Sequence, residues 1–174
     1  PINKLPNMLE ELQFGYAFNK PIMQWSLLQT KYMNIQTNIK KLIFGVYFNQ
    51  PLNNLPDTLQ YLELSMSYNR VITKFPTHLE VLILGSTTTI VQPLNNLPPN
   101  LKTLYTSVCR VPLDYLPQGL TKLVVGVFYN FSLQNLPNTI KYLAISSSDF
   151  NHSLDMLPDS IEHLVIRNYK QKIN

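Results

Sequence analysis

Four side chains in this sequence carry an imidazole or a thiol, groups that ligate metals and act as nucleophiles: His78, His152, His163 and Cys109. A metal site needs several such ligands at one point, and a nucleophile needs a neighbouring base. The four residues occupy different positions of a short repeat, so a regular fold keeps them apart. The acidic residues are scattered singly, and no Gly-rich phosphate loop is present. The sequence therefore predicts no enzyme activity, no metal site and no cofactor.

The repeat is marked by a Pro that returns about every 20 residues. We call one copy of the repeat a coil, and in one coil a Gln replaces the Pro. The markers are Pro6, Gln36, Pro56, Pro76, Pro98, Pro117, Pro137 and Pro158. Such self-similarity predicts a solenoid, in which stacked coils bury a shared core. We expect residues 1–174 to form one domain, with an irregular coil at 21–50.

Apolar residues recur at four places in each coil, and these places predict a parallel sheet. They lie one residue before the marker and three, six and eight residues after it. The last two places are two residues apart, so both side chains lie on one face of a strand. We expect these short strands to pair in parallel along the concave side. The rest of a coil is too short for a helix, which predicts a convex side of extended segments and short turns.

The bends after the strands carry aromatic residues and Asn. We expect the aromatic side chains to close the end of the core, and the Asn side chains to bond backbone groups between coils. The aromatic residues are Phe18, Phe48, Tyr68 and Phe150, and the Asn residues are Asn19, Asn49, Asn69, Asn130 and Asn151.

The strand positions five and seven residues after each marker point away from the core, onto the concave face. They include a row of apolar and aromatic side chains, which is typical of an interaction surface. The predicted partner-binding residues are Tyr61, Val81, Ile83, Tyr105, Val124, Tyr142 and Val165. We expect Lys41, Glu63 and Lys122 to set the register of the partner. Alternatively, the row reflects β-propensity alone, because strands favour Val, Ile and Tyr wherever they point.

A second candidate binding region is the segment 21–35, which departs from the repeat and holds Trp25. Insertions in solenoids form loops that often bind partners. The alternative is a helical turn packed on the convex side. We favour that alternative, because the apolar side chains of this segment require burial.

The repeat resembles a leucine-rich repeat and, more closely, the FNIP repeat. Residues 48–56 read FNQPLNNLP, and residues 18–22 read FNKPI. FNIP repeats are a leucine-rich-repeat-like family found mainly in social amoebae and in giant viruses that infect amoebae. In the viral members the repeats often follow an F-box, which implies substrate recognition in a ubiquitin ligase. An F-box upstream of Pro1 in the full gene product would support that role.

The charge and the Cys content of the sequence favour some classes of partner and one cellular location over others. The net charge is +4, from 14 Lys and Arg against 10 Asp and Glu, and the basic residues are dispersed. A dense basic stripe, typical of nucleic-acid binding, is missing from the sequence. The lone Cys favours an intracellular location, in the host cytoplasm if the protein is viral. We expect a protein partner, with self-association or assembly as an alternative. We expect no nucleic acid, no membrane and no small-molecule substrate.

Overall fold

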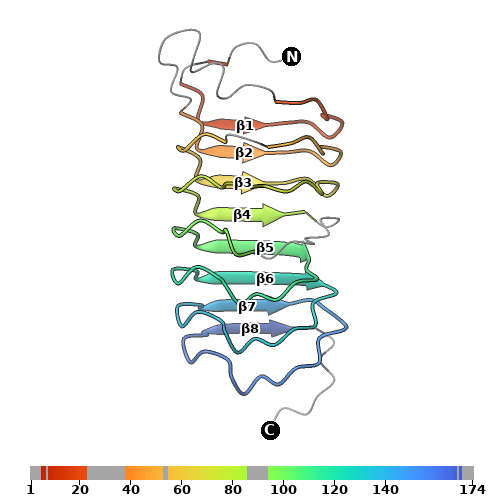
Figure 1. The fold of residues 1–174 in the computed structure, drawn as a ribbon, viewed down its shortest axis with the longest axis vertical. Helices are drawn as coiled ribbons and strands as arrows, with labels where there is room; N and C mark the ends of the chain where they lie inside the picture. The colour runs from red at the N-terminus through yellow and green to blue at the C-terminus, as the bar shows by residue number, and fades with distance from the viewer. Residues whose placement is uncertain are drawn as a thin grey trace.

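The computed structural model describes residues 5–6, 8–22, 38–52, 55–85, 94–167 and 169. In these residues eight parallel strands form one sheet, and each lies beside the strands that precede and follow it in the sequence (Figure 1). The strands are β1 (Glu11–Gln13), β2 (Lys41–Ile43), β3 (Tyr61–Glu63), β4 (Val81–Leu84), β5 (Thr103–Val108), β6 (Lys122–Val127), β7 (Tyr142–Ile145) and β8 (His163–Ile166). The predicted solenoid of stacked coils with a parallel sheet is confirmed.

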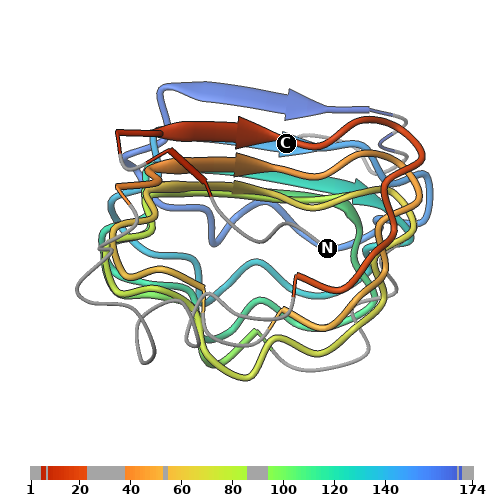
Figure 2. The same cartoon turned by 90° about the horizontal axis from the view of Figure 1, so that it is seen from above.

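The register of the sheet follows the repeat. Leu62 lies opposite Leu42 on one side and opposite Leu82 on the other. Equal repeat positions therefore stack into columns, with strands roughly 4.8 Å apart. Seen from above, the strands near both ends of the sheet lie farther out than the middle strands (Figure 2). The outer face of the sheet is consequently concave.

The core lies between the sheet and the opposite wall of the solenoid. The Leu six residues after each marker is fully buried, at 0% exposure, in six coils: Leu42, Leu62, Leu82, Leu104, Leu123 and Leu143. Full burial of one such side chain contributes about 1.5–3 kcal/mol. Leu12 is half-buried and Leu164 is 45% exposed, because among the described residues these strands have a neighbour on one side only. A coil thus needs a coil on each side to complete its core.

The wall opposite the sheet is made of tight turns and extended chain. The marker Pro accepts a hydrogen bond from the N–H three residues later, as in Leu59 to Pro56 and Leu120 to Pro117, both at 3.0 Å. No helix occurs in the part of the chain that the structure describes. The prediction for the convex side is therefore confirmed, and Figure 2 shows these segments below the sheet.

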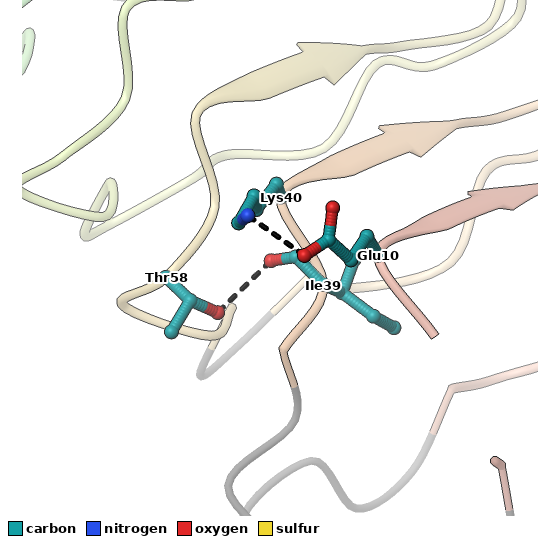
Figure 3. Close-up of polar contacts among 4 residues, drawn as sticks. All are labelled: Glu10, Ile39, Lys40 and Thr58. Atoms are coloured by element: carbon teal, nitrogen blue, oxygen red, sulfur yellow. Dashed lines mark hydrogen bonds and ion pairs between the residues drawn. The ribbon is translucent and has the colours of Figure 1, made fainter. Parts of the chain in front are cut away.

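Side chains at the turns tie each coil to the preceding one. Thr58 Oγ1 donates a hydrogen bond to the Ile39 carbonyl at 2.9 Å (Figure 3). Ser160 Oγ donates equivalently to the Ile140 carbonyl at 2.8 Å. These bonds satisfy backbone carbonyls that the sheet ladder does not reach. They fix the stacking of the coils where the chain enters the strands (Figure 3).

The bends contain the predicted aromatic column. The Phe48 ring stacks between Phe18 and Tyr68, with ring centroids 6.1 Å apart on each side. Phe150 is buried and stacks on Tyr129 at 6.2 Å. The sequence interpretation missed Tyr129, which takes the place of Phe in its coil and is 0% exposed.

The bends also contain the predicted Asn ladder. Asn19 Oδ1 accepts from the Asn49 N–H at 2.9 Å, and Asn49 Oδ1 accepts from the Asn69 N–H at 3.1 Å. Asn130 Oδ1 accepts from the Asn151 N–H at 3.2 Å. The short amide side chain thus replaces a backbone acceptor where the chain leaves the sheet.

Two strands are longer than the repeat predicts. β5 and β6 each have six residues, and the pair of Val108 and Val127 extends their ladder. Gly126 allows this close approach, because a Cβ there would lie 2.0 Å from the Ser107 carbonyl oxygen. Most of the segment 21–35 lies outside the described residues. Its role, and the assignment of 1–174 to one domain, stay predictions.

Candidate partner-binding face

The concave face brings the predicted binding residues together. Ile83, Tyr105 and Val124 lie side by side on β4, β5 and β6. Tyr61 lies beside Val81 on the adjoining column. Tyr142 and Val165 continue the two columns on β7 and β8. All seven predicted residues therefore lie on one face of one sheet.

The row is less open than the sequence suggested. Among the predicted residues, only Tyr105, at 40%, and Val165, at 37%, are exposed, and the other five are half-buried. Ala144, which the pattern places in the same row, is buried at 7%. Side chains on strands roughly 4.8 Å apart cover one another, and the concave curvature brings their tips closer. The face is a dense layer with Tyr105 as its most prominent aromatic side chain.

Charged side chains on β1 to β3 are paired within the face. Lys41 Nζ lies 2.8 Å from Glu11 Oε1 and 5.3 Å from the centre of the Tyr61 ring. The Tyr61 hydroxyl donates to Glu63 Oε2 at 2.8 Å. Partial burial, followed by this hydrogen bond, raises the pKa of Tyr61 to about 12. Lys41 and Glu63, expected to set the register of a partner, thus already have partners.

On β6 and β7 the charge pattern differs. Lys122 Nζ lies 4.9 Å from the centre of the Tyr142 ring, and no ion pair of Lys122 occurs among the described residues. His163 follows on β8, its ring centre 6.2 Å from that of Tyr142. Lys122 is exposed. This half of the face therefore combines an apolar row with an unneutralised cation.

The His and Cys side chains have structural surroundings. His78 Nδ1 and His152 Nε2 each lie 3.0 Å from a backbone carbonyl of the preceding coil, Asp57 and Asn130 respectively. Cys109 is buried, and this burial raises the pKa of its thiol. Within the described ranges, no three His, Cys, Asp or Glu side chains gather as a metal site would require.

The sequence interpretation missed an exposed rim beside the concave face. Tyr16 and Tyr47 are 61% and 52% exposed, and their rings meet edge to face with centroids 4.9 Å apart. Farther along, Arg110 lies 4.1 Å from the ring centre of Phe128, which has a φ of 65°. The aromatic residues that follow each strand were the sequence signal that could have predicted this rim. The repeat pattern does not distinguish a Phe that points into the core from a Tyr that points outward.

The molecule is similar to known repeat proteins in sequence and in fold. Residues 35–67 match the family model of the FNIP repeat. The crystal structure of CroV588, a circular LRR protein, matches with a TM-score of 0.76 and 32% sequence identity. The match covers 93% of this chain and 24% of CroV588, so this chain spans only part of that protein's length. No curated protein matches the sequence. Among the described residues, no helix is long and apolar enough to cross a membrane.

Proposed function

We propose that this chain, an FNIP-repeat solenoid with a leucine-rich-repeat-like fold, is a non-catalytic module that binds a protein partner through its concave face. The observation that carries the proposal is the contiguous row of Ile83, Tyr105 and Val124, with Tyr105 40% exposed at its centre. Tyr is enriched among the residues that dominate binding energies, because it is large, rigid and amphipathic.

The physical basis of binding is burial of apolar surface on a rigid platform. Each strand of the row is hydrogen-bonded to a neighbour on both sides, so its backbone is already ordered. The half-buried side chains of Ile83 and Val124 also have little conformational freedom left to lose. Apolar burial then contributes about 25 cal/mol per Å² with a small ordering cost.

The test replaces Tyr105 with Asp. It compares the proteins that wild type and variant capture from an amoebal lysate. Tyr115→Asp is the matched control, because Tyr115 is 73% exposed and lies outside the sheet. We expect the same partner to be retained by wild type and by Tyr115→Asp, and lost by Tyr105→Asp at an unchanged melting temperature. Retention of the partner by Tyr105→Asp would place binding elsewhere on the molecule.

Self-association is a second candidate, favoured by an exposed apolar side chain on β8. Leu164 is 45% exposed, whereas its counterpart Leu143 on β7 is completely buried. A coil from a second copy would cover Leu164 as β8 covers Leu143. Light scattering over a concentration series tests this candidate. Growth in mass that Leu164→Lys abolishes would support it, and a constant monomer mass would exclude it.

A further inference from the structure

Two Lys–Tyr pairs occupy equivalent positions on the concave face. Lys41 on β2 lies over Tyr61 on β3, with Nζ 5.3 Å from the ring centre. Lys122 on β6 lies over Tyr142 on β7, at 4.9 Å. Both Lys residues and both Tyr residues stand five residues after their markers, and each pair joins neighbouring strands. The repeat thus provides an internal control for what such a pair requires.

The two pairs differ in their carboxylates. The strand before Lys41 supplies Glu11, 2.8 Å from Lys41 Nζ. The strand before Lys122 supplies Thr103 at the same position.

The Tyr residues differ in the same way. The Tyr61 hydroxyl donates to Glu63, two residues further on the same strand, at 2.8 Å. In the coil of Tyr142 that position is held by the buried Ala144. Both carboxylates that complete the first pair are therefore replaced by uncharged residues at the second.

The second pair adjoins the apolar row of the proposed function. Lys122 shares β6 with Val124, and Tyr105 lies directly beside Val124. The outward positions of β4 to β8 carry Lys122 and His163 as their basic residues and hold no Asp or Glu. A partner that covers the row also removes water from Lys122. Such desolvation of a charge is unfavourable unless an opposite charge replaces the water.

We propose that the partner inserts a carboxylate at Lys122, in the place that Glu11 holds at Lys41, with apolar side chains packed on the adjoining row. The occupant is an acidic peptide segment, in which Asp or Glu is flanked by apolar residues. This inference rests on the proposed concave-face binding and adds the chemistry of the partner to it. It also assigns Lys122 to specificity, because a segment without the acid leaves the cation buried and unpaired.

The test starts from a displayed library of random dodecapeptides selected on the full chain. We expect the selected peptides to be enriched in Asp or Glu beside apolar residues. Lys122→Gln should weaken their binding by about tenfold or more, because the peptide carboxylate loses its partner. Thr103→Glu should weaken it similarly, since it supplies the carboxylate from within the chain. Lys74→Gln is the control, because it removes the same charge from an exposed site outside the sheet.

The outcomes separate this inference from the proposed function. Two outcomes would support concave-face binding but overturn the proposed partner carboxylate at Lys122. One is peptides that do not bind Tyr105→Asp yet lack acidic residues, and the other is peptides that bind Lys122→Gln as well as wild type. Peptides insensitive to Tyr105→Asp, or no enriched peptides at all, would count against both. Competition by rising concentrations of the chain itself would assign the face to a second copy, and would overturn an acidic peptide as its occupant.

Discussion

The interior coils and β8 are built from the same repeat, yet equivalent residues in them differ in how much they contribute to stability. Leu104 and Leu164 stand at the same repeat position, and they are 0% and 45% exposed. The residue type does not explain the difference in exposure, because both are Leu on a parallel strand beside another Leu. The number of neighbouring coils explains it. In a solenoid, the contribution of a residue depends on the coils stacked on both sides of it.

The largest expected effect is the difference in stability lost when each of the two Leu residues is replaced with Ala. Leu104→Ala should lower the free energy of unfolding by about 2–5 kcal/mol, because it leaves a cavity in a closed core. Leu164→Ala should cost less than about 1 kcal/mol, because water already reaches the side chain. Urea unfolding followed by circular dichroism measures both variants. Equal losses would show that something covers Leu164 in solution.

Glycine at the bends offers a second comparison between an interior coil and an end coil. A Cβ at Gly126 would lie 2.0 Å from the Ser107 carbonyl oxygen, whereas a Cβ at Gly15 would lie within 4 Å of no atom of the described residues. Gly126→Ala should cost about 1–3 kcal/mol, because the backbone of two coils must separate. Gly15→Ala should instead stabilise by about 0.4–1 kcal/mol, through the unfolded state. Thermal unfolding of the pair checks the opposite signs.

Two buried Tyr residues extend the comparison to the interior. The Tyr129 hydroxyl donates to the Ser132 carbonyl at 3.2 Å. The buried Tyr68 hydroxyl makes no hydrogen bond of normal geometry in the described part of the chain, and the Leu52 backbone near it only lowers its pKa against the larger effect of burial. Tyr129→Phe should therefore cost about 0.5–1.5 kcal/mol, and Tyr68→Phe should cost nothing or stabilise. Urea unfolding at neutral pH compares the two. A clear loss on Tyr68→Phe would reveal a partner such as buried water.

Alkaline unfolding tests the Tyr68 environment independently. Burial is the main cause that raises the pKa of Tyr68 to about 12, from 10.0. The unfolded chain therefore loses this proton first, so the stability that depends on it is present below pH 10 and is lost as the pH rises towards 12. Tyr68→Phe should lose less stability than wild type over that interval. Parallel pH profiles of the two proteins would contradict the raised pKa.

Features that recur in every coil could be predicted from the sequence, whereas features that occur in a single coil could not. The Leu column recurs in every coil, so the sheet, its register and the inward face could be derived from spacing alone. The register also places Glu11 beside Lys41, which spacing could have predicted. It could not predict that Ala144 is buried, because curvature and neighbouring side chains decide exposure. Nor could it predict the positive φ of Phe128, which depends on one irregular bend.

The smallest expected effect concerns the ion pairs that hold the outermost strands. Glu10 and Lys40 form one such pair at 2.7 Å (Figure 3). Lys141 and Glu162 form another at 2.8 Å, at the same repeat position near the opposite end of the sheet. The pair with Lys141 lowers the pKa of Glu162, so its contribution is present above the ordinary carboxyl pKa and is lost as the pH falls through the lowered value. Both side chains of this pair are more than half exposed, so water and salt weaken the attraction.

We therefore expect Glu162→Gln to leave global unfolding unchanged and to act only on the local opening of β8. The His163 N–H donates to the Lys141 carbonyl at 2.9 Å, and its hydrogen exchange reports that opening. Exchange should be slightly faster in the variant at low salt and near neutral pH, and equal to wild type in concentrated salt. The Val81 N–H, bonded to the Gln60 carbonyl between interior coils, should not respond. A response there would mean that the end and the interior open as one unit, which would contradict the difference between Leu104 and Leu164.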